Sequence, residues 1–139
     1  MSDGPITDFA TLDTLVRDSP FHAWLGVRLK AITADGIEIM MPWREEFVSD
    51  PKVRYTHGGI LASLIDLAGD YAVTARIGRG VPTVDMRVDY HQAAMAGPLL
   101  ARANVIKLGR TLATAEARVF DENEKLVASG RGVYLTLAR

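Results

Sequence analysis

Residues 56–77 are the longest run of the chain in which apolar side chains recur at helical spacing on nearly every side. Plotted at 3.6 residues per turn, the run has one bulky face, formed by Leu61, Leu64, Ala68, Tyr71 and Ala75. The opposite face has small side chains and two carboxylates, and it consists of Gly59, Ala62, Ser63, Asp66, Gly69, Asp70 and Val73. A helix that is apolar on most sides is normally buried, so the pattern predicts one long central helix.

The small face predicts that a second body approaches the helix closely. A second backbone and a bound ligand both require small residues, and the face alone does not separate them. Asp66 favours the interpretation that the face binds a ligand, because a carboxylate in a mostly apolar helix must be paired, solvated in a cleft or kept protonated. These situations are commoner at functional sites than in ordinary cores.

Six further segments alternate with the period of β-strands. Residues 27–34 and 37–42 predict a hairpin whose turn, Asp35-Gly36, tolerates positive φ. The other four segments predict four strands joined as a meander, at residues 83–91, 99–108, 112–120 and 126–137.

The third of these strands, residues 83–91, alternates between apolar and charged positions. We expect one face to carry Val84, Met86, Val88 and Tyr90. The other face should carry Asp85, Arg87 and Asp89. This alternation indicates an antiparallel sheet with one solvated side.

The N-terminal segment predicts a short amphipathic helix capped by Thr7 or Asp8, followed by a turn, PFHAW, that Gly26 closes. His22 in this turn is interpreted as a surface or packing residue. Residues 43–56 mix charge with proline and predict a loop. Together the elements predict one α+β domain over residues 1–139, with a helical segment at 1–25 and a core at 26–137. In that core a sheet of about six antiparallel strands wraps around one long helix.

Composition excludes several classes of function. A net charge of -1 argues against nucleic-acid binding, which needs a basic surplus. The absence of cysteine excludes disulfides, thiolate catalysis and zinc–thiolate sites, and it agrees with a cytoplasmic protein. We expect no membrane span, since polar residues interrupt the long helix, and no metal, since the three histidines lack a ligand spacing.

The run HGGILASLID, with Asp66 nine positions after His57, resembles the motif of the hotdog-fold acyl-CoA thioesterases of the PaaI-type family. The resemblance continues through VDMRVDYHQAAMAGP and KLGRTLATAEARVFDENEKLVASGRG, and it covers roughly residues 26–137. It implies a hotdog fold in which the sheet wraps the helix and two protomers join edge to edge. The expected assembly is a homodimer or homotetramer with sites at the subunit interface.

The same resemblance implies roles for individual residues. Asp66 is expected to act as general base or nucleophile, and the Gly58 N–H to polarise the thioester carbonyl at the positive end of the helix dipole. Gly59 leaves room for the thioester. His57 either fixes the loop geometry or transfers a proton, and Thr83 either holds the attacking water or is an ordinary strand residue.

Coenzyme A is expected to contact the turn at Gly109 and Arg110, with help from Arg131, unless these residues and Lys107 form only a solvated rim. It is part of the acyl-CoA substrate, so no separate cofactor is expected. The acyl group stays open, because it depends on how Trp43, Tyr71 and Met95 pack in the assembly.

Two departures from the family pattern leave alternatives open. The loop DPKVRYT at 50–56 lacks the Asn and Gly that supply a second donor to the thioester oxygen. Asp70 either adds a second charge to the site or pairs with the partner subunit. A non-catalytic acyl-CoA-binding protein is therefore an alternative, and a hotdog hydratase is a weaker one.

Overall fold

The computed structural model describes residues 4–138. The chain begins with two helices, α1 (Phe9–Asp18) and α2 (Pro20–Leu25), and a hairpin of β1 (Arg28–Ile32) and β2 (Gly36–Met41). A 3-10 turn, η1 (Glu45–Phe47), and a loop lead to the long helix α3 (Gly58–Ile77). Four strands complete the chain, namely β3 (Thr83–Tyr90), β4 (Leu99–Leu108), β5 (Leu112–Phe120) and β6 (Leu126–Leu135).

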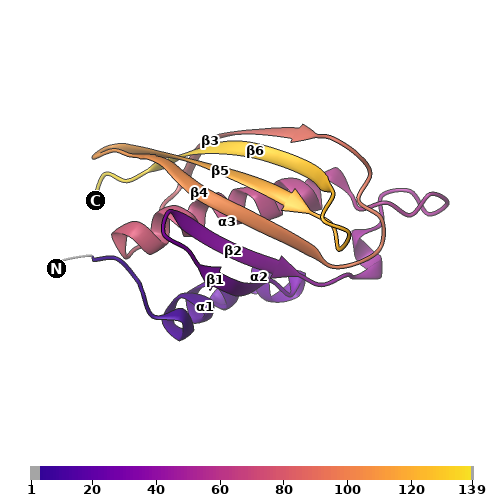
Figure 1. Ribbon diagram of the computed structural model, residues 1–139, viewed down its shortest axis with the longest axis horizontal. Coiled ribbons are helices and arrows are strands. Elements are labelled where there is room, and N and C mark those ends of the chain that lie inside the picture. The colour runs from indigo at the N-terminus through magenta and orange to yellow at the C-terminus, as the bar shows by residue number, and fades with distance from the viewer. Residues whose placement is uncertain (1–3, 139) are drawn as a thin grey trace.

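All six strands form one antiparallel sheet in the order β1-β2-β4-β5-β6-β3. Figure 1 shows α3 running along the sheet, with α1 and α2 next to β1 at the edge away from β3. One long helix held by a six-stranded sheet is the predicted hotdog architecture, so the fold prediction is confirmed.

The predicted four-stranded meander is wrong at one connection. Strands β4, β5 and β6 do form a meander, but β3 pairs with β6 and β4 pairs with β2. The connection at 91–98 carries the chain across the sheet, and eight extended residues span up to about 28 Å. This leaves β3 at an open edge of the sheet.

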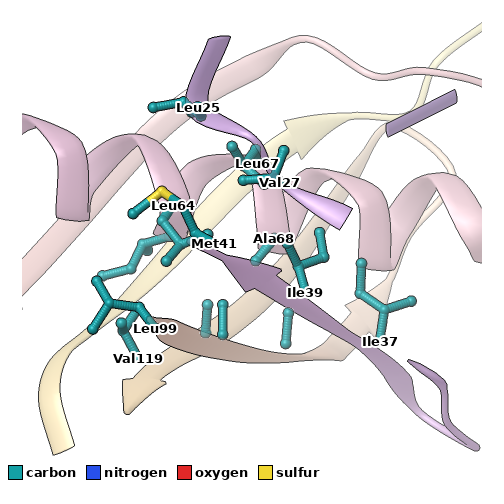
Figure 2. Packing of buried hydrophobic residues seen from close by; sticks show 14 of the residues in the cluster. Leu25, Val27, Ile37, Ile39, Met41, Leu64, Leu67, Ala68, Leu99 and Val119 are labelled. Atoms are coloured by element: carbon teal, nitrogen blue, oxygen red, sulfur yellow. The ribbon is translucent and has the colours of Figure 1, made fainter. Parts of the chain in front are cut away.

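The core lies between α3 and the sheet (Figure 2). Four members of the bulky helix face are buried as predicted, and they are Leu61, Leu64, Ala68 and Ala75. The sheet faces the helix largely with alanines, which let the helix lie close to the strands. Ala101, Ala103 and Ala117 share a cluster with these helix residues, whereas Ala113 and Ala115 pack with Val73 in a second cluster.

Two local expectations are wrong. Neither Asp35 nor Gly36 has a positive φ, and glycine is needed at 36 for a different reason. A Cβ at Gly36 would lie 1.7 Å from the Ala103 carbonyl oxygen on the adjacent strand. Val84 does not join Met86 and Val88 on the inner face but is 57% exposed, because the register shifts between Thr83 and Asp85.

Candidate active site

Asp66 lies in the middle of α3 and lines a cleft of about 710 Å³ between the helix and the segment that precedes β3. Asp70, one helical turn further on, lines the same cleft. Tyr71 of α3 also lines it, and the rest of its wall comes from α2, from the segment between α3 and β3, and from the C-terminal segment, including His22, Arg79, Val81, Pro82 and Leu137. The small helix face thus does open onto a cleft at its two carboxylates.

Thr83 reaches the carboxylate of Asp66 from the first residue of β3. Its hydroxyl donates a hydrogen bond of 2.8 Å to Asp66 Oδ1. Two of the residues singled out from the sequence therefore lie in direct contact, although 17 positions separate them in the chain. A carboxylate oxygen fixed in this way has a defined orientation in the cleft.

Tyr134 on β6 also reaches Asp66, and no sequence pattern singled it out. Its hydroxyl donates a 3.0 Å hydrogen bond to the Asp66 main-chain carbonyl and lies 3.5 Å from Oδ1. Burial and the charges of Asp66 and Asp70 raise the pKa of Tyr134 far above its usual value. The phenol is therefore neutral and remains a donor at every working pH.

Asp70 has an unusual environment for a carboxylate. Burial raises the pKa of Asp70 to about 7, and the charge of Asp66 adds to this effect. Hydrogen bonds from the Thr74 hydroxyl, at 3.2 Å, and from the Val81 main-chain N–H act in the opposite direction. Within one chain Asp70 thus shares the cleft with Asp66 and changes its charge near neutral pH.

The start of α3 forms a second and separate site. His57 is the N-cap, and its Nδ1 accepts a 2.8 Å hydrogen bond from the Gly59 N–H. Gly58 lines another pocket of about 380 Å³, and the hydroxyl of Tyr90 donates a 2.9 Å bond to the Gly58 carbonyl. Eight residues of helix, about 12 Å, separate Gly58 from Asp66. One chain therefore does not bring these two residues together.

The loop before α3 takes its shape from Asp50. The Asp50 Oδ1 accepts hydrogen bonds from the N–H groups of Lys52, at 2.7 Å, and Val53, at 3.1 Å. An acceptor occupied in this way is not a donor for a thioester oxygen. Closer to the helix, Thr56 is 3% exposed and its hydroxyl has no hydrogen-bond partner among the described residues.

The residues expected to contact coenzyme A lie in two places. Gly109 and the exposed Arg110 form the turn between β4 and β5, where the Thr136 hydroxyl donates a 2.7 Å bond to the Gly109 carbonyl. Arg131 is paired in register with Arg87 on β3 and Glu116 on β5, and it lines a shallow groove of charged side chains. The residue of β6 next to the turn is Leu135, which pairs with Leu112. Arg131 lies four residues away from Leu135 along β6, about 13 Å.

His22 is half-buried and packs as interpreted from the sequence. Its Nδ1–H donates to the Val16 carbonyl at 3.0 Å, and its ring meets Tyr71 edge-on. In residues 4–138 no cluster of acidic and histidine side chains has the arrangement of a metal site. Nor does any helix in that range have the length and apolar character needed to cross a membrane.

Comparison with known proteins gives a consistent assignment. Residues 54–128, more than half of the chain, match the family model of the thioesterase superfamily. A Halobacterium salinarum protein whose name marks it as a candidate esterase is 32% identical over 136 residues, which cover 90% of this chain and 89% of that protein. The Escherichia coli medium/long-chain acyl-CoA thioesterase YigI is 22% identical, with 88% and 89% of the two chains covered.

Solved structures show the same likeness. A thioesterase-superfamily protein solved by X-ray crystallography superposes with a TM-score of 0.89 at 50% identity, covering 91% of this chain and 96% of the other. The PaaI protein of the Escherichia coli phenylacetic acid degradation operon superposes with a TM-score of 0.74 at 24% identity, covering 81% and 85%. The second of these similarities concerns the fold alone.

Proposed function

The chain belongs to the thioesterase superfamily, and from this membership we propose that it is an acyl-CoA thioesterase that hydrolyses its substrate to a free acid and coenzyme A. The observation that carries the proposal is the Asp66 carboxylate, which lines an open cleft while Thr83 holds one of its oxygens. A carboxylate held at one oxygen keeps the other for chemistry.

Asp66 acts in one of two ways. As general base it takes a proton from water, and the water oxygen attacks the thioester carbon. The tetrahedral oxyanion then collapses, the C–S bond breaks, and the thiolate of coenzyme A takes up the proton. As nucleophile Asp66 attacks the carbon itself, forms an anhydride and releases the thiolate, and water then hydrolyses the anhydride. Trapping the anhydride with hydroxylamine distinguishes the two.

We propose that the oxyanion donor comes from a partner subunit. β3 is an edge strand with largely exposed residues. Antiparallel pairing of two such edges about a two-fold axis through the middle of the strand would set Thr83 of one protomer beside Tyr90 of the other. Thr83 contacts Asp66, and Tyr90 contacts Gly58. The pairing would therefore place Asp66 of one protomer opposite the helix N-terminus of the other, where the Gly58 N–H faces the developing oxyanion.

In this arrangement His57 is a positioning residue, because its ring is engaged with the Gly59 N–H. Arg110, in the exposed β4–β5 turn, binds a phosphate of coenzyme A through its guanidinium. Arg131 lies too far along β6 to share that phosphate, so we assign it at most a contact to another part of coenzyme A.

A second candidate function is acyl-CoA binding without turnover. The observation that favours it is Asp50, whose carboxylate is engaged in the turn and supplies no donor to the thioester. The two candidates are separated by measuring dye-detected thiol release from acetyl, hexanoyl, palmitoyl, benzoyl and phenylacetyl thioesters of coenzyme A. Multiple turnovers that Asp66→Asn abolishes support the enzyme, whereas tight binding without release supports the binding protein.

A further inference from the structure

Tyr134 is the largest fully buried side chain of the described residues, with 1% of its surface exposed. It points from β6 toward α3, and its hydroxyl contacts Asp66 at both the main chain and the carboxylate. Tyr134 is also the register partner of Thr83, whose hydroxyl holds the same Oδ1. Two directly paired strand positions thus direct two hydroxyls at one carboxylate.

The space for the Tyr134 hydroxyl is made by two glycines. A Cβ at Gly69 on α3 would lie 2.4 Å from that hydroxyl oxygen. A Cβ at Gly132 on β6 would lie 2.3 Å from the oxygen and 2.5 Å from Cζ of the ring. Glycine is a poor helix former, so its presence in the middle of α3 has its physical explanation in this contact.

We propose that Tyr134, together with Thr83, is a positioning residue that fixes Asp66 so that Oδ2 faces the thioester. Among residues 4–138, the two hydroxyls that reach the carboxylate both lie on the side of Oδ1, that of Thr83 at 2.8 Å and that of Tyr134 at 3.5 Å. The 3.0 Å bond to the Asp66 carbonyl anchors the helix backbone at the same residue. This inference rests on the proposed function, because it assigns a role in that reaction.

Positioning predicts a characteristic kinetic effect. Tyr134→Phe keeps the ring and removes the hydroxyl, so the cavity and the fold change little. Because a misplacement of about 1 Å at a reacting group costs up to about 100-fold in rate, we expect kcat to fall about tenfold. KM should stay within about twofold, since the hydroxyl does not contact the substrate.

The two glycines supply a matched pair of control variants. Gly69→Ala should lower kcat and Tm by displacing the hydroxyl. Combined with Tyr134→Phe, the same alanine meets ring carbons at 3.2 Å (Cζ) and 3.4 Å (Cε2) instead of the hydroxyl at 2.4 Å, and it should then raise Tm relative to Tyr134→Phe without lowering kcat further. Adding Tyr134→Phe should not restore the Tm or kcat of Gly132→Ala, because the alanine Cβ collides with ring carbons that phenylalanine retains.

The decisive experiment measures kcat, KM and Tm for the full chain and these variants on one thioester that the unaltered chain hydrolyses. Wild-type kcat in Tyr134→Phe, beside an inactive Asp66→Asn, would overturn the inference and leave the proposed function standing. The inference would also be overturned if the double variant lost kcat by the sum of the losses, in free energy, of Tyr134→Phe and Gly69→Ala. If Tyr134→Phe fails to fold, an unchanged kcat in Gly69→Ala would overturn the inference instead. Absence of hydrolysis by the unaltered chain would overturn both the inference and the proposed function.

Discussion

Asp70 gives the fold a pH dependence that a single substitution should remove. Its carboxyl is protonated in the folded chain up to about pH 7, because burial disfavours the charged form, whereas in the unfolded chain it ionises near 3.8. Below 3.8 the group is neutral in both states and costs nothing. Between 3.8 and 7 only the unfolded chain gains by ionising, so the free energy of unfolding falls as the pH rises.

The size of the effect follows from the separation of the two pKa values. The difference is about three pH units, and each corresponds to about 1.4 kcal/mol, so the folded chain loses about 4 kcal/mol by pH 8. Asp70→Asn has nearly the same shape and keeps one oxygen, which can accept from the Thr74 hydroxyl. We expect the variant to match the wild type near pH 4 and to be up to about 4 kcal/mol more stable at pH 8.

Urea unfolding at half-unit steps from pH 4 to pH 8, followed by circular dichroism, measures both curves. Asp13→Asn is the control of opposite sign. Asp13 is buried too, but hydrogen bonds from Arg28 and the Leu29 N–H outweigh burial and lower the pKa of Asp13. Its stabilisation is present above the unfolded pKa and is lost as pH falls, so Asp13→Asn should destabilise most at neutral pH. Parallel curves for wild type and Asp70→Asn would refute the reasoning about Asp70.

Three further kinetic predictions test the site. Thr83→Val, isosteric and suited to a strand, should lower kcat about 10- to 100-fold with little change in Tm, because it removes a hydrogen bond to a charged group; an unchanged kcat would exclude a role for this hydroxyl. Asp70→Asn should remove an inflection near pH 7 from the plot of kcat against pH, since Asp70 changes its charge there beside Asp66. A plot identical to that of the wild type would show that the charge of Asp70 has no effect on the rate. Arg110→Gln should raise KM about tenfold for acyl-CoA but leave KM unchanged for an acyl-pantetheine, which lacks the nucleotide phosphates; equal effects on both would place Arg110 away from them.

Much of the fold could be predicted from the sequence because its signals are local. The central helix was placed by its apolar pattern, and the bounds of β4 and β5 agree with the alternation along the chain. The position of β3 could not be predicted this way. Strand pairing depends on which edge a long connection reaches, and the alternation in residues 83–91 carries no information about its neighbour.

The candidate site could be predicted only in part. Asp66 and Thr83 were found through the helix pattern and the family motif, and the structure brings them into contact. Tyr134 was missed because a tyrosine in an alternating strand looks like an ordinary core residue. The one available signal was the pair Gly69 and Gly132, which only the three-dimensional contact connects. At Gly69 the small helix face accommodates this side chain of its own sheet rather than a ligand or a second backbone.

The central claim is that each thioester is held between Asp66 of one protomer and Gly58 of its partner. Two variants test it together, Asp66→Asn, which removes the base, and Gly58→Val, which blocks the approach of the thioester with a branched side chain. Each variant alone should be inactive. When the two are unfolded and refolded in equal amounts, about half of the dimers are mixed, and each mixed dimer has one site with both lesions and one with none. The account predicts that activity returns to about a quarter of the wild-type value if the sites act independently. No recovery, in a sample whose mixed dimers are confirmed by native mass spectrometry, would contradict the shared site.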